Sequence, residues 1–225
     1  MKTPSSISSS LALCLALALP SVSTSALADQ TAFDTITGST VETWGNWFGY
    51  RASKNDNTVV AYRFVSQATG YITGLSATIS LQDAPGTVGL SLYADNAGEV
   101  GSFLRALPVQ FAGWRVGAQF AEGSYTGGPL LQGGAAYWIV TPLASPMGNW
   151  DAVSGTQPPG GKLYLASGPG AVGSLNFNAK FNLPASDARG LKITVSAVPE
   201  ASAFELAMFG VLMTGGIVMR RRWSA

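Results

Sequence analysis

Apolar and polar residues alternate with a period of two along much of the middle of the chain. The clearest stretch is 175–183, where Leu, Phe or Ala at every second position alternates with Asn or Lys. This pattern predicts an antiparallel strand with one face buried and the other in water. Shorter stretches of the same period lie at 58–65, 71–81, 88–94, 135–141, 162–166 and 191–197.

Turn sequences separate these stretches. Gly, Pro, Asn and Asp gather at 83–86, 95–98, 127–129, 158–161 and 168–170, and no sustained 3.6-residue period occurs between 29 and 197. About eight to ten short strands with regular turns predict a mainly β fold, an antiparallel two-sheet β-sandwich of the jelly-roll type. An N-terminal signal-peptide helix and a C-terminal single transmembrane helix are expected to flank it.

Residues 1–28 have the features of a secretory signal peptide. A lysine near the start precedes an apolar run at 11–19, and the small residues Ala26 and Ala28 frame a cleavage site. An uncleaved anchor is disfavoured because the apolar run is too short to span a bilayer. Cys14 follows Leu13 rather than a small residue, which disfavours a lipoprotein.

A second apolar segment lies near the end of the chain. The run 206–219 carries no charge, and as a helix it would extend roughly 21 Å, short of the roughly 30 Å hydrocarbon core. It therefore predicts a marginal transmembrane helix. Arg220, Arg221 and Arg222 follow it, and because positive flanks stay on the cytoplasmic side, the upstream chain is expected outside.

Just before this run stand Val198, Pro199, Glu200, Ala201 and Ser202. Together with the apolar run and the arginines, they resemble the PEP-CTERM sorting signal of Gram-negative bacteria. The resemblance implies processing by an exosortase near the Pro-Glu element and transfer to the cell surface or the exopolysaccharide matrix. Ala201 stands where the family usually has a second proline, which leaves efficient processing open. An ordinary single-span anchor is the alternative for 198–225.

The remaining residues, 29–197, are enough for one domain with a sizeable core. They carry nine Lys and Arg against ten Asp and Glu, a net charge of −1, so no basic surface for nucleic acid is expected. The chain has one cysteine, inside the signal peptide, and no histidine. The mature protein therefore has no disulfide, no Cys or His zinc site and no Cys-His or Ser-His-Asp catalytic group.

Three segments of this domain resemble the choice-of-anchor ectodomains that accompany several C-terminal sorting tails. They are 70–75, 88–101 and 131–140, the last with Tyr137 and Trp138. The resemblance implies a β-sandwich surface module and supplies no catalytic residue or cofactor.

Asp95, Asn96 and Glu99 form an acidic group in a Gly-containing loop. Their oxygens are of the kind that binds calcium, but their spacing is not that of an EF-hand loop. We favour a hairpin turn in which the Asp95 carboxylate accepts hydrogen bonds from nearby backbone amides.

Trp44, Trp47 and Tyr50 form an aromatic group that suits a polysaccharide-binding surface, because sugar C–H faces stack on aromatic rings. Strand alternation places Trp44 and Tyr50 on one face and Trp47 on the other. Aromatic residues at strand spacing more often belong to a core, and the sequence favours core packing. The same alternatives apply to Trp114 and Trp150.

Glycoside hydrolysis needs two carboxyl groups about 5 to 10 Å apart, and no spacing in the sequence singles out a pair. The candidates are Asp83, Asp95, Glu99, Glu122 and Asp151. We therefore expect a non-enzymatic protein without a cofactor, exported through the inner membrane and anchored there transiently before it reaches the cell surface or matrix. Its expected partners are an exosortase, the membrane and exopolysaccharide. The alternatives are a carbohydrate-binding module and, less favoured, a secreted hydrolase.

Overall fold

The structure is a computed structural model that describes residues 28–51, 56–81, 86–111, 120–142, 147–155, 161–168, 177, 179–182 and 188–198. Ala28 and Val198 belong to these residues. The predicted helices, the other signal-peptide residues, the sorting element from Pro199 onward and Arg220 to Arg222 lie outside them. Within the described ranges, no helix has the length and apolar character that a membrane crossing requires.

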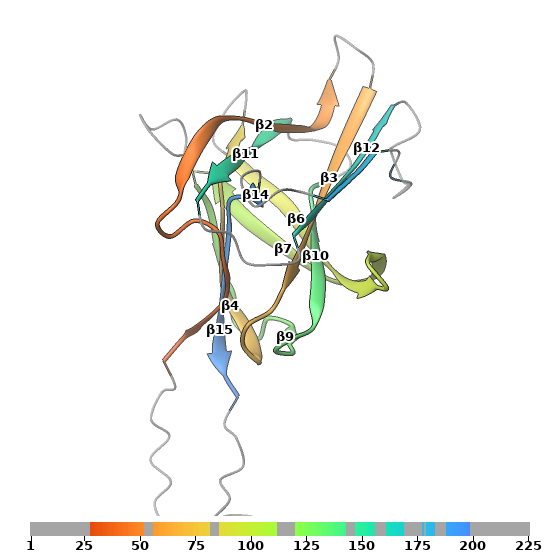
Figure 1. The fold of residues 1–225 in the computed structure, drawn as a ribbon. Coiled ribbons are helices and arrows are strands. Elements are labelled where there is room, and N and C mark those ends of the chain that lie inside the picture. The colour runs from red at the N-terminus through yellow and green to blue at the C-terminus, as the bar shows by residue number, and fades with distance from the viewer. Residues whose placement is uncertain are drawn as a thin grey trace, which may run out of the picture.

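The described residues form a mainly β, antiparallel structure (Figure 1). In chain order the strands are β1 (Gln30–Asp34), β2 (Thr40–Arg51), β3 (Asp56–Val65), β4 (Gly70–Ala77), β5 (Ile79–Leu81), β6 (Gly86–Asn96), β7 (Glu99–Phe111), β8 (Ala121–Ser124), β9 (Leu130–Leu131), β10 (Ala136–Val140), β11 (Gly148–Ser154), β12 (Lys162–Gly168), β13 (Ala179–Asn182), β14 (Ala188–Arg189) and β15 (Leu191–Ala197).

The strands join into one curled sheet. Its order is β1-β15-β4-β8-β7-β6-β10-β3-β2-β11-β14, with β12 also on β3, β13 on β12, β5 on β11 and β9 on β4. The curl depends on β2, whose residues from Val41 to Phe48 pair with β11 while Gly49 to Arg51 pair with β3. The long strand therefore carries the sheet around the corner at the top of Figure 1.

Two other segments of the chain, the β4–β5 and β14–β15 connections, contact each other at this corner. β4 continues into β5 through Thr78, and β14 continues into β15 through Gly190. The Thr78 backbone N–H donates to the Gly190 carbonyl at 3.0 Å, and the Asp151 N–H donates to the Thr78 carbonyl at 2.8 Å. A Cβ on Gly190 would lie 2.3 Å from the Thr78 hydroxyl oxygen, so this approach requires glycine.

The inner face of the curled sheet encloses the main core. Contacts between aromatic rings link its parts: Phe33 and Phe64 pack with tilted rings (centroids 5.3 Å apart), and Tyr62 and Trp150 pack edge to face (6.0 Å). These four side chains are at most 1% exposed. Alternation supplies the core, because every second residue of β3, β6 and β15 faces inward.

A smaller group of buried side chains, the outer cluster, lies on the opposite face of β3, β10 and β12. Its rings include Trp138 and Tyr164, whose centroids are 4.6 Å apart. The members of the outer cluster are Val59, Ala61, Trp138, Val140, Tyr164 and Ala166.

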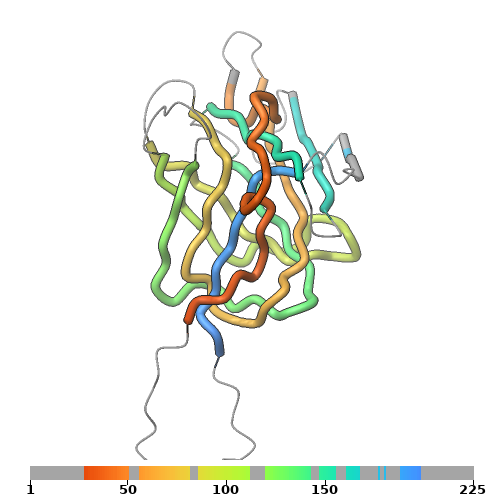
Figure 2. Tube along the Cα trace, turned by 60° about the vertical axis from the view of Figure 1, so that its left-hand side comes forward, coloured from red at the N-terminus to blue at the C-terminus, as the bar shows by residue number. Residues whose placement is uncertain are grey.

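Both ends of the described domain lie at the same end of the molecule. β1 pairs antiparallel with β15, with Gln30 opposite Val195. Figures 1 and 2 accordingly show the start of β1 and the end of β15 side by side, on the side away from β2. We call this the terminal end.

The period-two stretches correctly predicted strands. Those at 58–65, 88–94 and 191–197 lie within β3, β6 and β15, while 71–81 is divided at Thr78 into β4 and β5. Of the stretch 175–183, residues 179–182 form β13 and Phe177 lies outside a strand, while 175–176, 178 and 183 lie outside the described residues.

Candidate functional site

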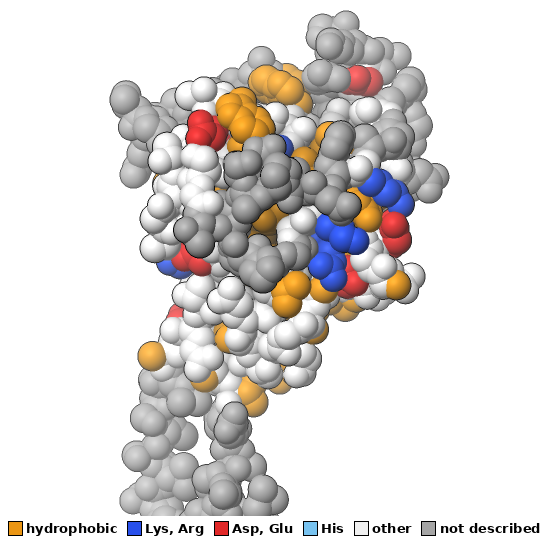
Figure 3. Space-filling view, viewed as in Figure 1, with side chains coloured by type: hydrophobic (Ala, Val, Ile, Leu, Met, Phe, Trp, Pro, Cys, Tyr) orange, Lys and Arg blue, Asp and Glu red, His pale blue; other side chains and the backbone are white. Residues whose placement is uncertain are grey.

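The aromatic residues of β2 lie on the surface. Trp44 is 48% exposed, and Trp47 and Tyr50 are each 44% exposed. The preference for core packing was therefore wrong for these three residues, although it was right for Trp150, which is fully buried. Trp114 lies outside the described residues. In Figure 3, hydrophobic side chains gather over β2 at the upper end of the molecule.

Two irregularities in β2 explain why strand alternation failed there. Val41 pairs with Val153 and Gly45 with Asp151, so residues 42–44 stand opposite Ala152 alone. This bulge changes the direction of the side chain at Trp44. Gly49 has φ 88°, which interrupts the alternation again between buried Phe48 and exposed Tyr50.

Polar side chains from neighbouring strands lie beside these aromatic rings. The Arg189 guanidinium on β14 lies 5.6 Å from the Trp44 ring centroid and donates to the Asn46 side-chain oxygen. This cation–π contact supports the Trp44 ring from one side. Further along β2, Trp47 is directly opposite Asn149 of β11. Both amides are engaged within the protein, since Asn46 accepts from Arg189 and Asn149 donates to Asp151, so the exposed rings are the part of this surface that can stack on sugar faces.

Asp151 lies next to this surface, at the corner of the sheet. Burial raises the pKa of its carboxyl to about 6, although hydrogen bonds from Asn149 and Ser80 and the charge of Arg189 act in the opposite direction. Such a carboxyl is protonated over part of the mildly acidic range. Among the described residues, no second carboxylate contributes to this shift.

Asp95 occupies a different position, at the tip of the β6–β7 hairpin. Its Oδ1 accepts hydrogen bonds from Arg63 Nε (2.7 Å) and Trp138 Nε1 (2.9 Å), and its Oδ2 accepts one from the Gly98 backbone (2.9 Å). Partial burial would raise the pKa of this carboxyl, but these hydrogen bonds and the Arg63 charge outweigh it and lower the pKa. The predicted bond from Asp95 to a turn amide is confirmed.

Glu99, across the same turn, faces β12 and β13. Its carboxylate binds Lys180 Nζ at 2.6 Å and accepts a hydrogen bond from the Tyr164 hydroxyl at 3.3 Å. The Lys180 hydrogen bond lowers the pKa of Glu99. Asp95 and Glu99 thus hold the hairpin tip against the outer cluster. In the described part of the chain, no three acidic, Cys or His side chains are placed to hold a metal ion.

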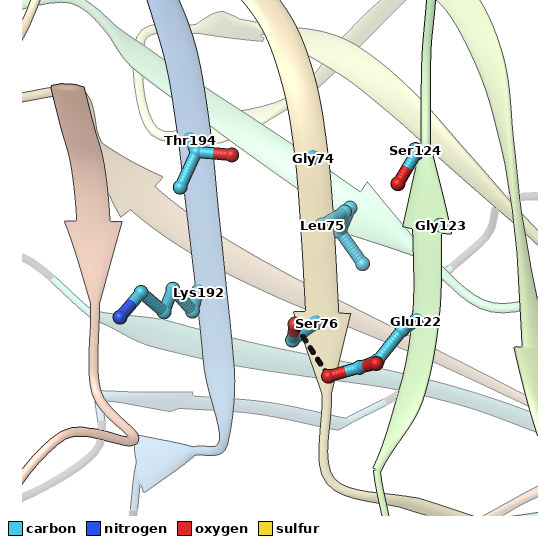
Figure 4. Close-up of a pocket in the computed structure, with 8 residues that line it drawn as sticks. All are labelled: Gly74, Leu75, Ser76, Glu122, Gly123, Ser124, Lys192 and Thr194. Atoms are coloured by element: carbon cyan, nitrogen blue, oxygen red, sulfur yellow. Dashed lines mark hydrogen bonds between the residues drawn. The ribbon is translucent and has the colours of Figure 1, made fainter. Parts of the chain in front are cut away.

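A shallow groove of about 230 Å³ crosses β15, β4 and β8 (Figure 4). Glu122 extends toward Ser76, whose hydroxyl donates to it at 3.5 Å. Lys192 points toward β1, where its ammonium pairs with Asp34 at 3.2 Å. The lining residues are Gly74, Leu75, Ser76, Glu122, Gly123, Ser124, Lys192 and Thr194.

The candidate carboxylates do not converge on a catalytic pair. Asp83 lies outside the described residues, Glu122 is on β8, and Asp151 is on β11. Asp95 and Glu99 share a hairpin, but a general acid needs a raised pKa and both of theirs are lowered. The geometry therefore supplies no argument for the hydrolase alternative.

Sequence reasoning missed the polar partners Arg63, Arg189 and Trp138. Arg63 and Trp138 lie at positions of the predicted strands that alternation turns away from the main core. This position was the feature of the sequence that could have identified them. Their meeting depends on the pairing of β3 with β10, where Trp138 is opposite Arg63. Comparisons with known proteins add no identity: no protein-family model matches the sequence, and no curated protein matches it.

Proposed function

We propose that this protein is exported and sorted to the cell surface or extracellular matrix through its C-terminal tail, with a non-enzymatic β-domain as the delivered part. The observation that carries the proposal is the order of the tail elements, from Val198–Ser202 through the apolar run 206–219 to Arg220–Arg222. An exosortase-type enzyme would process it, and the inner membrane would hold it in transit.

The geometry of the domain supports this proposal. Both chain ends leave from the terminal end, so a domain held there by its tail presents β2 and its aromatic residues on the side away from the membrane. We further propose that the curled sheet is a two-sheet sandwich of the jelly-roll type, with β5, β11, β14 and part of β2 as the smaller sheet.

Cell fractionation combined with intact mass of the mature protein tests the sorting proposal. We expect loss of residues 1–28 and trimming near Pro199 to Ala201 in material from the surface or matrix. The double variant Pro199→Ala, Glu200→Ala should accumulate untrimmed, and Ala201→Pro should be trimmed at least as well as the natural chain. An intact C-terminus held in the inner membrane in all three chains would make the tail a plain anchor.

A second candidate function, carbohydrate binding, is favoured by the exposure of Trp44, Trp47 and Tyr50. Each exposed ring offers apolar surface on which a sugar can stack. Exopolysaccharide is the ligand class that fits the proposed location.

Glycan arrays and affinity electrophoresis in soluble polysaccharides test this candidate. We expect the double variant Trp44→Ala, Trp47→Ala to bind at least about tenfold more weakly, since tenfold corresponds to only about 1.4 kcal/mol. Phe103→Ala is the matched control, because Phe103 is 57% exposed but lies on β7. Equal binding by the double variant and the control would exclude the aromatic surface.

A further inference from the structure

The terminal end of the domain combines exposed apolar side chains with almost no charge. Tyr71 is 48% exposed, Leu130 38% and Val198 37%. Tyr71 and Leu130 are directly opposite each other on β4 and β9, and Val198 follows Ala197, which pairs with Gly70. The three side chains therefore belong to one surface, which we call the terminal patch.

Charged residues are scarce around the terminal patch. Among the described residues 28–32, 66–71, 126–136 and 195–198, which form the ends of β1, β4, β9, β10 and β15, the only charged side chain is Asp29. One further charged group reaches this region from another strand, because Arg105 of β7 donates to the Gly127 carbonyl at 2.7 Å. Figure 3 shows the same contrast on one face, with Lys, Arg, Asp and Glu placed higher on the molecule and white or hydrophobic atoms at the terminal end.

The chain beyond the patch restricts what can lie next to it. Only residues 199–205 separate Val198 from the apolar run that begins at Leu206. Even fully extended, seven residues reach at most about 25 Å. If the apolar run is in a bilayer, the terminal patch must stay within that distance of the membrane surface.

From this placement we propose that the terminal patch is a lipid-facing surface, on which the domain rests while its tail is in the membrane. The inference rests on the proposed function, because the tail must be inserted. Tyr is favoured at the membrane interface. An end with few charged side chains can approach lipid headgroups without removing water from charged groups at its surface. Three part-exposed side chains bind lipid weakly by themselves, but tethering by a short linker raises their effective concentration at the surface.

A second copy of the chain is the main competing occupant. Three part-exposed side chains fall far short of the roughly 800 Å² per partner that a stable interface buries.

The experiment places an environment-sensitive dye on the full-length chain in vesicles. Cys14→Ser removes the only natural cysteine, and Leu130→Cys then carries a nitrobenzoxadiazole dye. The vesicles are prepared from phosphatidylethanolamine and phosphatidylglycerol in a molar ratio of three to one, with or without nitroxide-labelled lipid. Phe103→Cys is the matched control, since Phe103 is exposed on β7, a strand that carries none of the three side chains of the terminal patch.

We expect the dye at position 130 to shift its emission to the blue and to be quenched by nitroxide lipid, while the dye at position 103 does neither. Flotation with the vesicles but no quenching at position 130 would overturn the inference and leave the sorting proposal standing. Energy transfer between dyes at position 130 on different copies, without lipid quenching, would assign the patch to a second copy. Failure to float at all would overturn both proposals.

Discussion

Asp95 and Asp151 are two mostly buried aspartates whose pKa values move in opposite directions. Asp95 receives three hydrogen bonds, one of them from the Arg63 guanidinium, and its pKa is lowered. Asp151 receives hydrogen bonds from the neutral groups of Asn149 and Ser80, and burial raises its pKa to about 6. The comparison teaches that two opposing effects set the pKa: the hydrogen bonds and charge at Asp95 outweigh desolvation, whereas desolvation at Asp151 outweighs two neutral donors and the Arg189 charge.

Removing the Asp95 side chain tests its role most strongly. In Asp95→Ala the fully buried Trp138 indole N–H loses its acceptor, and the hairpin tip loses its tie to β3. We expect a loss of about 2 to 4 kcal/mol in the free energy of unfolding, measured by urea denaturation. Asp95→Asn, which keeps an acceptor oxygen, should lose less. Equal losses in the two variants would mean that the charge carries the entire effect.

The pH dependence of stability should show both aspartates with opposite signs. Burial raises the pKa of Asp151 to about 6, well above the ordinary range of an aspartate, so the free energy of unfolding falls as pH rises from about 4 to 6, by about 2 to 3 kcal/mol. Asp95, with a lowered pKa, contributes stability that is lost as pH falls below about 4. Urea unfolding across this range should therefore show maximal stability near the lower end of the pH range over which Asp151 ionises, at about pH 4.

Replacing Asp151 separates its contribution to the pH dependence of stability from that of Asp95. Asp151→Asn cannot ionise, so at pH 8 we expect it to be more stable than the natural chain by about the 2 to 3 kcal/mol that ionisation of Asp151 costs. Below pH 4, where the natural Asp151 is protonated, the difference should vanish. A destabilised variant at pH 8 would show that the Arg189 charge makes ionised Asp151 favourable, against the direction of its pKa.

The smallest effect concerns the turn beside Asp95. Ala97 has φ 54° and Gly98 has φ 89°, as in the two-residue turns that favour glycine or asparagine at both positions. Ala97→Gly should raise the free energy of unfolding by up to about 1 kcal/mol. The reverse change, Gly98→Ala, should lower it, because the new Cβ would also lie 2.7 Å from Lys162 Nζ. Thermal unfolding of both variants checks the opposite signs.

These features divide into what local sequence predicts and what it does not. Period-two alternation predicted β3, β6 and β15, and turn chemistry predicted the Asp95 bond to a backbone amide. β7 was missed because exposed Phe103 and Leu104 break its alternation, which becomes regular only from Leu107 onward. The surface position of Trp44, Trp47 and Tyr50 depends on a bulge and on the backbone at Gly49.

The partners of the two aspartates depend on contacts distant in sequence. Arg63 lies 32 residues from Asp95, and Trp138 lies 43 residues from it. Only the pairing of β3, β10 and β6 brings them together, and no local pattern contains that pairing. For the same reason the sequence could not place Arg189 beside Trp44.

The position of β15 between β1 and β4 has a mechanical consequence. A domain held at its C-terminus and pulled at its far end transmits the load along β15, parallel to the strand. Both ladders are then loaded in shear, so their hydrogen bonds must break together rather than one after another from an end. We expect single-molecule pulling between Val198 and a handle on β2 to give a higher rupture force than pulling between the two chain ends, which peels β1 from β15.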